Sequence, residues 1–185
     1  MGNTEAKRKQ SNILARQCLV EALMHLLETK SLSSVSITEL TREAGVSRMT
    51  YYRNYHSLDE IFITYLNDIF TAYQNDVSGW ADKGNYNDYK NMLHCYSYFY
   101  AHRDFIRCLL KCGMGDILLQ ALTDYIVETY YTSDKGNRVY YTLQAFAGSL
   151  YNIYIAWILN DARESAEEMA SIICGIYRED AADIS

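Results

Sequence analysis

Thiol and imidazole groups gather near the middle of this chain, where they could bind a soft metal ion or respond to oxidation. Cys108 and Cys112 are four residues apart, on one side of any helix, and His94, Cys95 and His102 are near in sequence. Cysteine and histidine are the ligands that zinc and copper prefer. Alternatively, each thiol packs as a small apolar side chain. Since no second closely spaced pair completes a site, we favour packing and predict no metal and no cofactor.

The sequence contains none of the short motifs that mark common catalytic or nucleotide-binding sites. It has no G-x-x-x-x-G-K-[ST], no G-x-G-x-x-G, no H-E-x-x-H and no G-x-S-x-G. Acidic pairs such as Glu167-Glu168 are typical of solvated helix starts. We therefore predict that the protein is not an enzyme.

A second group of side chains suits contact with nucleic acid. Arg48 can pair bidentately with guanine, and Met49 can contact a thymine methyl group. Thr50 and Tyr52 are residue types that mostly position a protein on phosphates. These residues are consecutive or nearly so, so a single short element would have to present them.

Helix signals before and after this group predict such an element. Ser36 and Glu39 have the spacing of a capping box, which opens a helix over Ile37–Ala44. Gly45 then suits the left-handed end of that helix, and Ser47 can cap a second short helix. Two short helices joined by a tight glycine turn form a helix-turn-helix, whose second helix enters the major groove of DNA.

This stretch resembles the DNA-binding domain of TetR-family transcriptional regulators. The resemblance rests on Ala44-Gly45-Val46-Ser47, on Thr50 to Tyr55 and on Ser57 to Ile61. It implies an all-α fold, with an N-terminal three-helix helix-turn-helix DNA-binding module fused to a helical ligand-binding and dimerisation body, about nine helices in total. It also implies a homodimer that binds double-stranded DNA at an inverted repeat, most simply a repressor released by a small-molecule effector.

The resemblance assigns DNA contacts to the recognition helix and its flanks. Arg48 and Thr50 are expected to face base edges or nearby phosphates. Leu58 stands where the family usually has a phosphate-binding lysine, so His56 or Arg53 is expected to replace that contact. The predicted DNA-binding residues are Thr38, Ser47, Arg48, Met49, Thr50, Tyr52, Arg53, Asn54 and His56.

A longer helix is predicted to complete the DNA-binding module. It runs from about Gln10 to Glu28, with an apolar stripe that packs on the two short helices. Tyr51 and Tyr55 replace apolar residues of the family pattern and are expected in the core. Lys7-Arg8-Lys9 begins a polar arm that either touches phosphates or is a solvated tail.

The net charge of the chain changes from positive to negative near the end of the helix-turn-helix. Residues 1–56 carry eight Lys or Arg against five Asp or Glu, a net +3, whereas residues 57–185 carry a net −9. A basic module on an acidic body suits docking on a polyanion. We expect a DNA-binding domain over 1–56 and a regulatory and dimerisation domain over 57–185. The chain also has no proline, which favours helix throughout.

The body contains an unusual uncharged stretch, residues 139–160. Its length fits a membrane span, but polar residues in mid-span and scattered tyrosines favour a central bundle helix that also contacts a partner chain. Gly148 lies among small residues, where another helix could approach closely. The predicted dimer-interface residues are Gly148, Tyr151, Ile155, Met169 and Ile173.

Tyrosines crowd the segment 86–100 and recur along the uncharged stretch. They could line a cavity for a small aromatic or amphipathic effector, or simply form core. The predicted pocket residues are Tyr96, Tyr100, Met114 and Tyr154. Further helices are expected at about 86–101, 102–111, 116–131 and 164–178.

Two other functional readings stay open. The body could bind a partner protein, which would make the chain a co-activator, or the helix-turn-helix could serve protein contacts only. The first ten residues are polar, so we expect no secretory signal, a cytoplasmic location and no membrane association.

Overall fold

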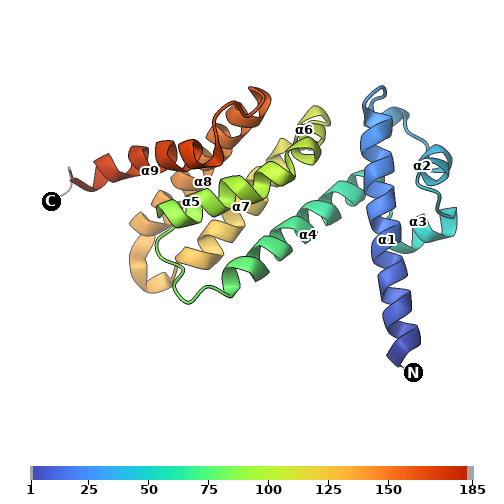
Figure 1. Ribbon diagram of the computed structural model, residues 1–185, viewed down its shortest axis with the longest axis horizontal. Coiled ribbons are helices and arrows are strands. Elements are labelled where there is room, and N and C mark those ends of the chain that lie inside the picture. Colours follow the sequence, from blue (N-terminus) through green and yellow to red (C-terminus); the bar gives the residue numbers. More distant parts are fainter. Residues whose placement is uncertain (1, 183–185) are drawn as a thin grey trace. The chain divides into compact units, whose positions relative to one another are not determined.

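The computed structural model describes the backbone of residues 2–182 and the side chains of residues 6–177. Over this range the chain forms nine α-helices, two short 3-10 helices and no strand (Figure 1). The predicted all-α fold is therefore confirmed. The elements are α1 (Gly2–Leu27), η1 (Leu32–Ser34), α2 (Ile37–Glu43), α3 (Arg48–Asn54), α4 (Leu58–Ser78), α5 (Tyr89–Ala101), α6 (Arg103–Lys111), α7 (Gly115–Tyr130), η2 (Ser133–Lys135), α8 (Gly136–Leu159) and α9 (Ala166–Ala182).

Helix α1 differs most from its predicted extent. It begins at Gly2 rather than near Gln10, so Lys7-Arg8-Lys9 is helical and does not form an irregular arm. No proline or glycine follows Gly2 within this segment, so nothing in the sequence stops the helix from extending toward the N-terminus.

By its internal contacts the chain divides into residues 1–68, here the N-terminal unit, and residues 69–185, here the body. The division falls within α4, whereas the sequence suggested a boundary at residues 56 and 57. In the N-terminal unit, α1 packs on both α2 and α3. The core of this unit consists of Leu19, Leu23, Leu27, Leu40, Tyr51, Tyr55, Ile61, Phe62 and Leu66, each at most 2% exposed.

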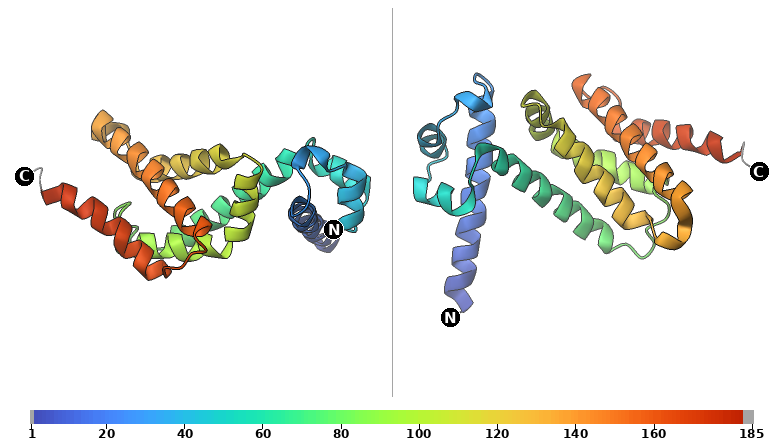
Figure 2. Two further views of the ribbon diagram at one scale, coloured as in Figure 1. Left: turned by 90° about the horizontal axis from the view of Figure 1, so that it is seen from above. Right: turned by 180° about the vertical axis from the view of Figure 1, so that it is seen from behind.

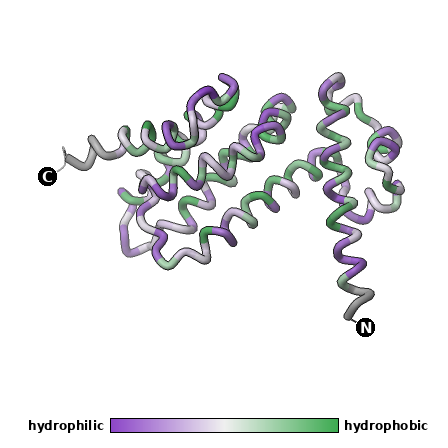
Figure 3. The backbone as a smooth tube through the Cα atoms, in the orientation of Figure 1, coloured by the Kyte–Doolittle hydropathy of each residue, from purple (hydrophilic) through white to green (hydrophobic). Residues whose placement is uncertain are grey.

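In the body, α5 packs on α9 and α7 packs on α8 (Figures 1 and 2). Figure 3 shows that hydrophobic and hydrophilic residues are interspersed along the helices of the body. Helix α8, which contains most of the uncharged stretch, buries Phe146, Leu150 and Trp157 but leaves Tyr141 and Leu159 more than 60% exposed. In a single chain, therefore, α8 is buried along one side only. Among the described residues, no helix is long and apolar enough to cross a membrane.

Candidate nucleic-acid interface

Helix α2 begins at the predicted capping residue. The Ser36 Oγ accepts a hydrogen bond from the Glu39 backbone N at 3.2 Å, and the Ser36 backbone in turn bonds to the Glu39 carboxylate. The ammonium of Lys30 pairs with that carboxylate and, as the largest influence, lowers the pKa of Glu39. His25 of α1 lies 2.8 Å from Glu43 of α2. Side chains therefore fix both ends of α2 to the segment before it.

The turn between α2 and α3 depends on a left-handed residue. Gly45 has φ of +64°, a conformation that costs other residues a clash at Cβ. The Val46 backbone N then donates to the Thr41 carbonyl at 3.0 Å, and Ser47 starts α3 by accepting from the Thr50 backbone N at 3.1 Å. The predicted helix-turn-helix is thus present in the local backbone of residues 37–54.

The inward side of α3 holds the helix in place. Tyr51 and Tyr55 are 0% and 2% exposed, so the prediction that both belong to the core is confirmed. Arg16 of α1 donates from Nε to the Tyr55 hydroxyl at 3.3 Å and from Nη2 to Asp68 at 2.6 Å. Burial raises the pKa of Tyr55, so its hydroxyl stays protonated. The recognition helix therefore has a rigid attachment to α1.

The outward side of α3 is open to solvent. Met49 is 77% and Tyr52 is 56% exposed, and Arg48 and Arg53 are exposed beside them. Thr38 and His56, which flank this side in sequence, are also exposed. A helix that is buried on one side and presents arginine, tyrosine and methionine on the other is suited to enter a major groove.

Three predicted contact residues have local partners already. The Thr50 hydroxyl lies 2.9 Å from the Ser47 hydroxyl, and Asn54 donates from Nδ2 to the Thr50 carbonyl at 2.8 Å. Thr50 and Asn54 are half-buried. These side chains stabilise α3, which leaves Arg48 and Met49 as the freest groups for base edges and Tyr52 for the phosphate backbone.

A groove on the N-terminal unit brings residues of α1 beside two of the predicted contact residues of α3. It has a volume of about 450 Å³ and is lined by Arg8, Lys9 and Asn12 of α1 together with Arg53 and Asn54 of α3. All its charged residues are basic, which favours phosphate. The charges of Arg8 and Lys9 were visible in the sequence, but only the extended α1 brings them beside α3.

Comparison with known proteins agrees with this geometry. Residues 86–179 match the TetR-type family described as "Transcriptional regulator C-terminal region". The chain belongs to the TetR family of transcriptional regulators. No curated protein sequence matches it.

Solved structures with the same fold include other regulators. The dihydroxyacetone kinase operon activator DhaS aligns with a TM-score of 0.63 and 15% identity, over 89% of this chain and 94% of that chain. The fatty acid degradation regulator FadR from Bacillus halodurans aligns with a TM-score of 0.54 and 11% identity, over 88% of this chain and 93% of that chain. At such low identities, the likeness concerns the fold alone.

The body of this TetR-family regulator brings together two of the four predicted pocket residues. Tyr96 and Tyr154 line a cavity of about 20 Å³ between helices of the body. Tyr100 is instead 40% exposed, and Met114 is half-buried just before α7. Neither lines that cavity. Phe99 and Tyr151 do line it and were not predicted as pocket residues.

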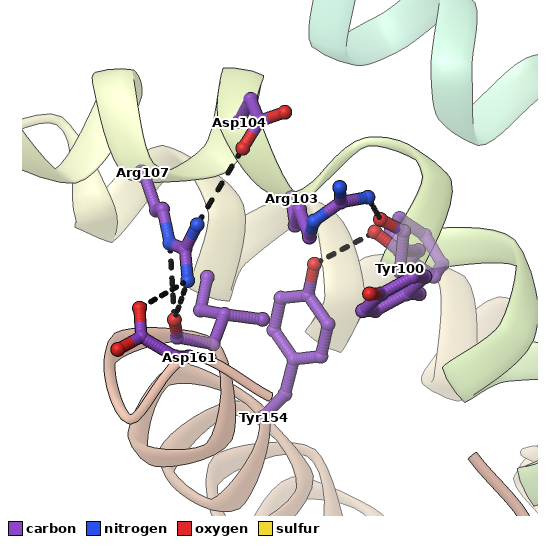
Figure 4. Close-up of polar contacts among 8 residues, drawn as sticks. Tyr100, Arg103, Asp104, Arg107, Tyr154 and Asp161 are labelled. Atoms are coloured by element: carbon purple, nitrogen blue, oxygen red, sulfur yellow. Dashed lines mark hydrogen bonds and ion pairs between the residues drawn. The ribbon is translucent and has the colours of Figure 1, made fainter. Parts of the chain in front are cut away.

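Helix α8 is tied to the corner between α5 and α6 at two points (Figure 4). The Tyr154 hydroxyl donates to the Phe99 carbonyl at 2.9 Å. Arg107 of α6 donates from Nε to the Ile158 carbonyl at 3.0 Å and lies 3.4 Å from Asp161. Helix α8 therefore carries both Tyr154, which lines the cavity, and the Ile158 carbonyl, which binds Arg107 of α6.

The predicted dimer-interface residues divide into two groups in the TetR-family body. Gly148, Tyr151 and Ile155 are half-buried, and a Cβ placed on Gly148 would have no atom within 4 Å. Met169 and Ile173 are 5% and 0% exposed because they pack inside their own subunit, so they present almost no surface to a partner. The exposed apolar residues of α9 are Ile172 and Ile176, each 47% exposed.

Two of the five cysteines of the regulator are buried and three are half-buried. Cys95 is buried, and burial raises the pKa of its thiol to about 12, so it stays protonated. Cys108 and Cys112 are half-buried. Within the described part of the chain, no three His, Cys, Asp or Glu side chains are placed to hold a metal ion.

Proposed function

We propose that the protein binds an inverted-repeat operator as a homodimer and represses transcription until a small molecule binds in its body. The observation that carries this proposal is the two-sided recognition helix. Tyr51 and Tyr55 fix α3 from within, and Arg48, Met49 and Tyr52 stand in solvent. The basic groove beside α3 supports additional contact with phosphates.

Dimerisation through α8 and α9 is supported by apolar surface that a single chain leaves open. Tyr141, Leu159, Ile172 and Ile176 are all exposed, and Gly148 leaves room for the approach of another helix. Two copies joined here would form a four-helix bundle about a two-fold axis. The two half-sites should then lie about 34–36 Å apart, or a multiple of that.

Release of DNA requires that an effector bind one arrangement of the dimer more tightly than the other. The cavity lined by Tyr154 is supported as the effector site. Tyr154 is hydrogen-bonded to the end of α5, and its helix α8 is hydrogen-bonded to α6, so a ligand beside Tyr154 would act on both contacts. We further propose that the protein acts in the cytoplasm and catalyses no reaction.

Activation is the second candidate function. It is favoured by the DhaS structure, described as an operon activator, whose fold aligns over 89% of this chain. In this reading the body would bind a partner protein. A reporter fused to the regulated promoter separates the two, because deletion of a repressor raises expression and deletion of an activator lowers it.

The DNA-binding claim itself is tested by fluorescence anisotropy with DNA from beside its own gene and with random DNA of equal length. We expect tighter binding to the first, and affinity for both that falls as salt rises. Absent binding to both would instead support a helix-turn-helix used for protein contacts, and equal binding to both would contradict sequence-specific recognition.

A further inference from the structure

Two small cavities lie side by side within the body. The first cavity reaches Tyr96 and Tyr154, and the second cavity reaches Asn91 and Tyr130. Each has a volume of about 20 Å³, room for about one water molecule. The side chains that line both cavities, and so form the wall between them, are Cys95, Phe99, Leu122 and Leu150.

The residues that line the two cavities exclude a charged ligand. They include no Asp, Glu, Lys, Arg or His. A buried charge without a partner costs several kcal/mol or more, so a carboxylate or an ammonium group would not be accepted there. A molecule that occupies both cavities must therefore be uncharged.

The first cavity suits an apolar group. The surface that faces it is apolar, so the Tyr96 hydroxyl, which is buried without a hydrogen-bond partner, does not face the cavity. The Tyr154 hydroxyl is already used, because it donates to the Phe99 carbonyl at 2.9 Å. Leu118 and Phe70 complete the wall. Apolar cavities of this kind stay dry and accept hydrocarbon.

The second cavity has a polar end built around Asn91, which is 4% exposed. Its Nδ2 donates to the Lys83 carbonyl at 2.7 Å and to the Asn85 carbonyl at 2.6 Å. Carbonyls only accept hydrogen bonds, so these two partners fix which end of the amide is nitrogen. The Oδ1 atom therefore points away from them and, among the described residues, accepts no hydrogen bond from the protein.

Tyr130 supplies the complementary donor. Its hydroxyl lies 3.2 Å from Asn91 Nδ2, an amide nitrogen that cannot accept a hydrogen bond, so the hydroxyl hydrogen is directed elsewhere. No acceptor for that hydrogen is present in the described part of the chain. Burial raises the pKa of Tyr130 and keeps this hydrogen in place. The second cavity thus offers one acceptor and one donor.

We propose that the effector is an uncharged amphipathic alcohol or phenol, whose hydroxyl bonds to Asn91 and Tyr130 while its apolar part displaces the shared wall and fills the first cavity. A hydroxyl both donates and accepts, which matches the two free groups. This proposal rests on the proposed function in that the body binds the effector. Because each cavity holds only about one water, part of the binding energy is used to open the wall.

The test uses 1-hexanol, hexyl methyl ether and hexanoate, titrated into the full-length protein by calorimetry. The ether keeps the acceptor but loses the donor, and hexanoate adds a charge. We expect hexanol to bind about fivefold more tightly than the ether, since one buried hydrogen bond contributes about 1 kcal/mol. Hexanoate should show no binding.

Tyr130→Phe and Leu150→Ala refine the test. Tyr130→Phe removes the donor that the oxygens of both hexanol and the ether accept from, so it should weaken both ligands alike and leave the preference for hexanol, which comes from Asn91, in place. Tyr141→Phe, at an exposed tyrosine of α8, should change neither affinity. Leu150→Ala opens the wall and should tighten hexanol binding at least tenfold. Hexanol binding to this variant can therefore be measured even if the closed wall makes binding to the natural protein too weak to detect.

Equal affinity for hexanol and ether, tightest binding of hexanoate, or no binding of hexanol to Leu150→Ala would each overturn the proposed ligand class. The proposed function is judged separately, by operator binding. A protein that binds its operator but none of these compounds keeps its DNA-binding function and loses this ligand class. A protein that prefers hexanol to the ether but binds no DNA keeps this ligand class and loses the proposed function.

Discussion

The guanidinium of Arg16 donates a hydrogen bond to the hydroxyl of Tyr55, 3.3 Å away, and so joins the middle of α1 to the end of the recognition helix. The same guanidinium reaches Asp68 of α4 at 2.6 Å. Tyr55 is 2% exposed, so Arg16 is the partner that satisfies a buried phenol. The position of α3 therefore depends on a polar contact as well as on apolar packing.

Arg16→Met should destabilise the N-terminal unit because it leaves the Tyr55 hydroxyl buried without a partner. We expect a loss of about 1–3 kcal/mol in the free energy of unfolding, measured by urea titration. Tyr55→Phe removes the hydroxyl itself and should cost less. If Tyr55→Phe were the more damaging change, the hydrogen bond would not be the stabilising contact.

Arg48→Ala tests base reading by the outward side of α3. It should weaken operator binding by about 1–3 kcal/mol and reduce the preference for operator over random DNA. Tyr52→Phe should weaken binding to both DNAs alike, as expected of a phosphate contact. Arg163→Ala removes the same charge from an exposed position in the body and serves as the control. Equal losses on both DNAs for Arg48→Ala would contradict its role in reading bases.

The basic groove between α1 and α3 should contribute affinity that depends on salt. The double variant Arg8→Gln/Lys9→Gln should lower the slope of log K against log salt by about 1.8, because each phosphate contact contributes about 0.9. Its preference for operator over random DNA should not change. Arg138→Gln/Arg163→Gln, with two exposed charges removed from the body, provides the matched control. An unchanged slope in the groove variant would show that α1 does not touch DNA.

Gly148→Leu should shift the protein toward monomer without unfolding it. A Cβ at Gly148 meets no atom of its own chain within 4 Å, so the added side chain would project toward the partner. Sedimentation velocity measures the shift, and operator affinity should fall with it. Gln120→Leu adds the same side chain at an exposed site on α7 and should remain dimeric. A Gly148→Leu dimer with normal operator affinity would place the interface elsewhere.

Local signals made the DNA-binding module predictable from the sequence. The caps at Ser36 and Ser47, the glycine turn at Gly45 and the inward tyrosines act within a few residues of one another, so their spacing determines the outcome. The long start of α1 was missed because its first turns are polar on every side, which gives no periodic apolar pattern.

The sequence was a poorer guide to which apolar residues of the body are buried and which are exposed. Met169 and Ile173 fall on an apolar stripe of α9, but the sequence does not say whether that stripe faces α5 or a second chain. The structure shows that it faces α5 and that Ile172 and Ile176 are the exposed residues. The role of Asn91 was also missed, because its partners are backbone carbonyls of the preceding loop.

The most direct test of the central claim is the spacing dependence of operator binding. After footprinting identifies the inverted repeat beside the gene, five base pairs are inserted between its half-sites, which moves them to opposite faces of the duplex. A dimer with two fixed recognition helices should lose at least tenfold in affinity on this DNA, while a single half-site keeps weak binding. Undiminished affinity after the insertion would contradict the account of a dimeric helix-turn-helix regulator.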